Sequence, residues 1–181
     1  MILDKLSDWP TPERIRQLLK INVILLIILY PILTYLFLIS YPVNFAESQL
    51  SFSGAVIKSH HKMMTNEQFV LYRIANIVDY LFMILYGTIF FCISLISARK
   101  IKSNLKWCRA GYFIALLGIT SAVCDGIENI FIFLMLSDPL NFPDIWAITH
   151  SIFALIKGIF MFTVFGYAII TYLLRKTKKL E

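Results

Sequence analysis

The chain has 181 residues, of which 59% are hydrophobic and 15% are charged. This composition lies outside the usual range of soluble domains, so we expect a single domain that spans a membrane. The net charge of +6 comes mainly from short basic segments beside apolar stretches, so it gives no reason to predict a nucleic-acid partner.

A helix-start signal precedes the first apolar stretch, which covers residues 21–41. Thr11 is a preferred cap, Pro12 suits the first helical position, and Glu13 places an acid in the first turn. We therefore expect a short amphipathic helix on the inner membrane surface that leads into a first span. The apolar stretch is too long for a cleaved signal peptide and lacks a small-residue cleavage pattern, so we expect it to be retained.

The loop at residues 42–68 mixes large apolar side chains with Ser and Gly. A disordered tether would carry fewer large apolar groups, so we expect this loop to pack over one end of the helices. His60 and His61 are adjacent and cannot share a helix face, so we interpret them as surface residues. Thr65 and Gln68 have the spacing of a capping box, which predicts a helix start just before the second span.

Three further stretches are long enough to cross a membrane, which takes about 20 helical residues. They cover residues 69–98, 110–136 and 146–174. Between the last two, Asp138-Pro139 predicts a turn and Pro143-Asp144 a new helix start. The predicted fold is therefore all-α, a polytopic membrane protein whose residues 1–181 form one up-down bundle of four transmembrane helices.

The Lys and Arg residues predict the orientation of the bundle. Of the 17, 13 lie in the N-terminal segment, the loop after the second span and the C-terminal segment. Short basic loops stay cytoplasmic, so both termini are predicted to be cytoplasmic, and residues 42–68 and 137–145 to face outward.

Each of the last three spans carries one stripe of polar or ionisable side chains. The spacings of three, four and seven residues place each stripe on one helical face. Ionisable groups inside a membrane cost several kcal/mol, so they tend to face the bundle interior in pairs. The candidate site residues are Arg73, Asn76, Asp79, Asp125, Glu128, Asn129, His150 and Lys157.

Four of these charged groups are predicted to share one depth. A helix rises about 1.5 Å per residue. Counting from the predicted cytoplasmic end of each helix therefore places four groups at a height of roughly 24 to 30 Å: Asp79, Asp125, Glu128 and Lys157. This layer is in the outer third of the membrane, where water or a ligand can enter from outside. The first span contributes no charged residue to this layer, and we expect it to form one side of the site or to line its entrance.

Three functions fit this layer. The favoured hypothesis is a pocket that binds a lipid, a small amphiphile or a cation, with Asp125 and Glu128 as main anionic contacts and Lys157 as the internal counter-charge. One alternative is a structural or partner-binding membrane subunit whose buried charges only lock the helices together. The other is an intramembrane lipid-modifying enzyme that uses paired carboxylates as acid and base.

The sequence motifs do not decide whether the chain is an enzyme or a binding protein. No zinc-protease or serine-nucleophile motif is present, so we predict no metal site, and the sequence identifies no cofactor. Cys92, Cys108 and Cys124 have no C-x-x-C spacing, which argues against a disulfide-forming oxidoreductase. The expected partners are membrane lipids, with a further membrane protein or a second copy of the chain as alternatives.

Overall fold

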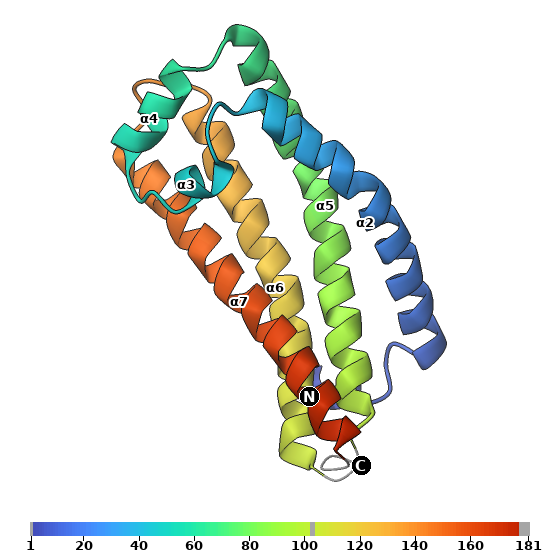
Figure 1. Cartoon of the computed structure of the whole chain (residues 1–181). Helices are drawn as coiled ribbons and strands as arrows, with labels where there is room; N and C mark the ends of the chain where they lie inside the picture. The colour runs from blue at the N-terminus through green and yellow to red at the C-terminus, as the bar shows by residue number, and fades with distance from the viewer. Residues whose placement is uncertain (1, 102–103, 178–181) are drawn as a thin grey trace. The chain divides into compact units, whose positions relative to one another are not determined.

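A computed structural model describes residues 2–101 and 104–177 (Figure 1). Regular secondary structure in these ranges is entirely α-helical. Four helices are long and apolar enough to cross a membrane: α2 (Pro12–Ser40), α5 (Asn66–Arg99), α6 (Leu105–Met135) and α7 (Asp144–Lys176). The shorter helices are α1 (Ile2–Lys5), α3 (Phe45–Gln49) and α4 (Gly54–Lys62). The chain thus has the helices expected of a multi-pass membrane protein.

The predicted helix starts are confirmed. Thr11 Oγ1 accepts a hydrogen bond from Arg14 N at 3.4 Å, and α2 begins at Pro12. Thr65 and Gln68 form the capping box in both directions, with distances of 3.2 and 2.9 Å. Helix α7 begins at Asp144, directly after Pro143.

The amphipathic segment before the first span is not a separate helix. The structure has one unbroken helix from Pro12 to Ser40. Residues 12–20 contain no Gly or Pro after the first position, so nothing in their backbone interrupts the hydrogen-bond ladder. These residues are therefore the first turns of α2.

The chain divides into two compact units. Unit 1 comprises the described parts of Met1–Leu26, Leu85–Ala122 and Gly158–Glu181, and unit 2 comprises Ile27–Ile84 and Val123–Lys157. Each long helix contributes residues to both units, so each unit contains segments of all four.

Unit 1 has an apolar core that ties the N-terminal segment to the helices. Ile15, Leu95 and Tyr167 are buried within it. The Arg99 guanidinium donates from Nε to Leu6 O at 2.9 Å and from Nη1 to Pro10 O at 2.7 Å. These two bonds hold the segment before α2 against the end of α5.

Unit 2 contains the residues predicted to form a packed loop. Helices α3 and α4 form within residues 42–68, and Figure 1 shows them beside the neighbouring ends of α6 and α7. Lys58 Nζ lies 2.8 Å from Asp144 Oδ1 at the start of α7. Ile57 is buried in a core with Phe142 and Tyr72. Phe45 packs against the same core, whereas Leu50, Phe52 and Val56 are exposed, so only part of the apolar loop surface is packed.

Large apolar side chains cover much of the outside of the long helices. Leu38 and Phe162 are 76% and 80% exposed, and Ile27 is 67% exposed. Exposed apolar surface of this extent is unusual for a monomer in water and is expected of helices that face lipid.

We expect Gly118→Ala to destabilise the protein because α5 and α6 approach closely at this glycine. An added Cβ would lie 3.0 Å from Phe91 N and 2.7 Å from Phe90 Cβ. The cost should be about 1 to 3 kcal/mol of unfolding free energy, as for other overpacked sites. Unfolding in detergent micelles measures it.

Gly158→Ala is the matched control for this substitution. An added Cβ there meets no atom within 4 Å, so helix propensity alone should act and stabilise by up to about 1 kcal/mol. Equal effects of the two substitutions would contradict close packing at Gly118.

Candidate functional site

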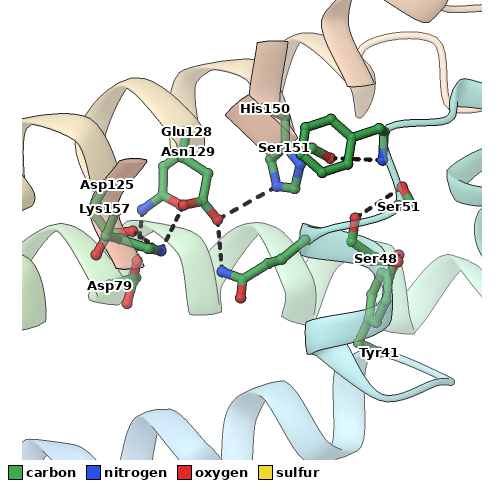
Figure 2. A network of polar contacts seen from close by, with 12 residues as sticks. Tyr41, Ser48, Ser51, Asp79, Asp125, Glu128, Asn129, His150, Ser151 and Lys157 are labelled. Atoms are coloured by element: carbon green, nitrogen blue, oxygen red, sulfur yellow. Dashed lines mark hydrogen bonds and ion pairs between the residues drawn. The ribbon is translucent and has the colours of Figure 1, made fainter. Parts of the chain in front are cut away.

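Six of the predicted site residues converge in unit 2 (Figure 2). They come from three helices and are brought together by the stripes seen in the sequence, because each stripe occupies one helical face. We name this group the acidic cluster, and its members are Asp79 on α5, Asp125, Glu128 and Asn129 on α6, and His150 and Lys157 on α7.

Lys157 lies between two carboxyl groups. Its Nζ is 2.7 Å from Asp125 Oδ1 and 2.6 Å from Glu128 Oε2. Asp125 is 5% exposed and Glu128 is fully buried. At these distances in a low-dielectric interior the charges attract strongly, which offsets the cost of removing them from water. The ammonium group therefore takes the place that a bound cation would take between these carboxylates.

The second oxygen of Glu128 contacts two different elements. Its Oε1 accepts a hydrogen bond from Gln49 Nε2 at 2.7 Å and lies 3.5 Å from His150 Nε2. Gln49 is the last residue of α3, so the short helix between α2 and α5 reaches the acidic cluster directly. No sequence pattern predicts this contact, because a glutamine in a loop of mixed polarity is a common residue by itself.

Asp79 has a neutral partner. Its Oδ2 accepts a hydrogen bond from Asn129 Nδ2 at 2.7 Å. Asp79 is 9% exposed, more than the other two acids of the cluster. The cluster therefore contains three carboxyl groups and one ammonium group, and His150 adds a positive charge only when it is protonated.

Arg73 and Asn76 make their hydrogen bonds outside the acidic cluster. Arg73 Nη2 donates to the carbonyl of Leu136 at 2.7 Å. Asn76 Nδ2 donates to the carbonyl of Tyr72, one turn earlier on its own helix, at 2.7 Å. Arg73 thus donates a hydrogen bond at the end of α6, where the last carbonyl groups lack partners within the helix.

A second group of polar contacts joins Tyr41 and Ser48, which are labelled in Figure 2, to His60. The Tyr41 hydroxyl is 2.6 Å from Ser48 Oγ, and Ser48 Oγ is 2.6 Å from His60 Nδ1. Burial raises the pKa of Tyr41 to about 12, against the opposite effect of the Ser48 hydrogen bond. Ser48 and Gln49 are adjacent in α3, so this helix contacts both polar groups.

The interpretation of His60 and His61 as surface residues is wrong. They are 8% and 3% exposed. Adjacent residues do point to different sides of a helix, but other elements cover both sides of this end of α4. The His61 ring packs against Phe69 and Phe142, and the His60 ring packs against Tyr41.

Both histidines are held in surroundings that favour the neutral ring. Burial lowers the pKa of His60, and Glu47 partly offsets this. Burial also lowers the pKa of His61, with the carbonyl of Pro139 acting in the opposite direction. His61 Nδ1 lies 3.0 Å from that carbonyl, which can only accept, so Nδ1 carries the proton of the neutral ring.

Metal binding and thiol chemistry gain no support from the described residues. Over residues 2–101 and 104–177, no group of three or more His, Cys, Asp or Glu side chains could hold a metal ion. Cys92, Cys108 and Cys124 are free and buried, which suits small apolar fillers.

No known family model, curated protein or solved structure matches the chain.

We expect Lys157→Met to lower the unfolding free energy by about 3 to 5 kcal/mol, because it leaves two buried carboxyl groups without their shared cation. Unfolding in detergent micelles measures the change. Adding Asp125→Asn and Glu128→Gln to this variant should recover part of the loss.

Lys58→Met is the control for removing one lysine from an ion pair. Its partner Asp144 has a side chain that is 63% exposed, so the cost should stay below about 1 kcal/mol. A cost at Lys157 as small as that at Lys58 would show that the buried pairing contributes little.

The two histidines of α4 should make stability depend on pH. Their pKa values are lowered in the folded chain, so below the usual value of about 6.5 the unfolded chain binds more protons. This contribution is complete above about pH 6.5 and is lost as the pH falls towards the folded pKa values.

His61→Phe should reduce this dependence while keeping an aromatic ring beside Phe69 and Phe142. Melting temperatures between about pH 7.5 and pH 5 test it, since the loss on acidification should be smaller than in the unmodified chain. Identical pH profiles would show that His61 does not titrate differently on folding.

Proposed function

We propose that this chain is a multi-pass membrane protein that binds a small cation, or the cationic head group of a small amphiphile, at the acidic cluster. The observation that carries the proposal is the charge balance of the cluster. Asp79, Asp125 and Glu128 are all buried, and the ammonium group of Lys157 contacts Asp125 and Glu128, whereas Asp79 accepts from the uncharged amide of Asn129. Buried carboxylates without a counter-charge take up a proton or bind a cation.

Asp79 is the best candidate for the ligand contact. Lys157 already neutralises much of the charge on Asp125 and Glu128, whereas Asp79 accepts from the uncharged amide of Asn129. Asp79 is also the most exposed acid of the cluster. This differs from the expectation that Asp125 and Glu128 are the main anionic contacts, because the structure gives these two acids an internal cation.

The proposal includes the orientation predicted from the basic segments. With both termini in the cytoplasm, the loop that forms α3 and α4 is outside, and a ligand enters the single transmembrane domain from that side. Gln49 and His150 then lie between the ligand and the outer surface. Gln49 donates a hydrogen bond to Glu128 Oε1, and His150 Nε2 lies 3.5 Å from the same oxygen.

A purely structural role is the main alternative, and the position of Lys157 favours it. One ammonium group that joins Asp125 and Glu128 also joins α7 to α6. A cluster with only this role would tolerate an amide in place of Asp79, because an amide keeps a hydrogen bond with Asn129. Ligand binding to an Asp79 variant separates the two functions.

We expect octylammonium to stabilise the purified protein in neutral detergent, and octanesulfonate, which has the same chain with the opposite charge, not to do so. Asp79→Asn should weaken octylammonium binding by about tenfold or more, the loss of one hydrogen bond between charged groups. Thermal shift and isothermal titration measure both effects.

Glu67→Gln is the control, because Glu67 is an exposed acid in the first turn of α5. It should leave octylammonium binding unchanged. Equal binding of the cation and the anion, or equal binding by the Asp79 and Glu67 variants, would exclude the proposed site.

A further inference from the structure

Unit 1 contains a location whose chemistry differs from that of the acidic cluster. A cavity of about 160 Å³ is formed between the first turns of α2 and the last turn of α5. Its lining residues are Pro12, Ile15, Arg16, Ile96, Arg99 and Lys100. The two helices run in opposite directions here, so the beginning of one candidate span meets the end of another.

The lining combines an apolar surface with three cations. Arg16, Arg99 and Lys100 carry positive charge, and no acidic side chain is among the described residues that line the cavity. Arg16 and Lys100 are exposed and free to reach a ligand. Such a concentration of like charge is unfavourable by itself and is relieved by a bound anion.

Arg99 has hydrogen-bonding capacity left over. Its Nε and Nη1 donate to the carbonyls of Leu6 and Pro10. Its Nη2 is buried and has no acceptor among the described residues. A buried donor without an acceptor costs about 1 to 3 kcal/mol, and a rotation of the Arg99 guanidinium toward an anion in the cavity would relieve this cost.

We propose that this cavity binds the phosphate head group of an anionic membrane lipid. The planar guanidinium groups of Arg16 and Arg99 are suited to phosphate oxygens, and Lys100 adds a point charge. Pro12, Ile15 and Ile96 then contact the apolar part of the lipid next to its head group. A free phosphate ion would gain nothing from these three residues.

The position of the cavity also favours a lipid. It lies where two candidate spans end, at Pro12 and at Arg99, which is the level at which head groups meet the protein. Basic residues at such ends attract anionic lipids by about 1 kcal/mol each. A cavity lined by three of them would turn this general attraction into a defined site.

The test compares an anionic lipid with a zwitterionic lipid. Phosphatidylglycerol and phosphatidylcholine with the same acyl chains are titrated into the purified protein in neutral detergent, and retained lipid is counted by native mass spectrometry. Phosphatidylglycerol should bind at least about tenfold more tightly. Equal binding of the two lipids would overturn the proposal.

The variant R16Q/K100Q should lose this preference by about tenfold or more. Both side chains are exposed, so the melting temperature without lipid should not change. Arg99 is left in place because it holds the segment before α2. K20Q/K106Q removes the same charge from exposed positions on the same two basic segments, outside the cavity lining, and should change binding by less than about twofold.

Two results would refute the site. Equal losses in the two double variants would mean that the basic segments attract lipid without a specific cavity. If inorganic phosphate displaced phosphatidylglycerol completely at low millimolar concentration, the ligand would be the free anion and not a lipid. Asp79→Asn should bind phosphatidylglycerol normally, so a failure at the acidic cluster does not affect this test.

Discussion

The contact of Lys157 with Asp125 and Glu128 is the interaction on which the organisation of unit 2 depends. A single ammonium group joins α7 to two successive turns of α6. Since every atom involved is largely removed from water, the helices cannot shift relative to each other at this level without separating buried charges. The same contact determines the charge of the site, because it gives Asp125 and Glu128 a positive partner, whereas Asp79 has other partners.

The acids around this contact differ in how deeply they are buried and in their partners. Glu128 is the innermost acid, and its two oxygens face different neighbours: Lys157 on one side, Gln49 and His150 on the other. Asp79 is held at the edge by Asn129. The proposal of a cationic ligand rests on this position of Asp79, whose partner at the edge of the group is an uncharged amide.

The sequence predicted the helices and most of the cluster because both follow from local periodicity. Stripes at three- and four-residue spacing must share a face, and counting residues from the basic helix ends put Asp125, Glu128 and Lys157 close enough in depth to meet. The capping box at Thr65 could be predicted for the same reason, because it involves residues only three positions apart.

The contacts made by the loop could not be predicted in this way. Gln49 and Glu128 are 79 residues apart, so their contact depends on how α3 packs. The spacing of residues along the chain does not predict this packing. The prediction that His60 and His61 lie at the surface is wrong for a related reason. The rule that adjacent residues face different sides is correct, but burial depends on what covers each side, and here Tyr41, Phe69 and Phe142 do.

The three cysteines have a practical consequence for mapping orientation. All of them are buried, at Cys92, Cys108 and Cys124, and they are the complete set in the chain. A thiol placed on an exposed loop residue would thus react with a membrane-impermeant reagent far faster than the native ones. The side of the membrane on which each loop lies can therefore be read by labelling in intact cells without first removing any native cysteine.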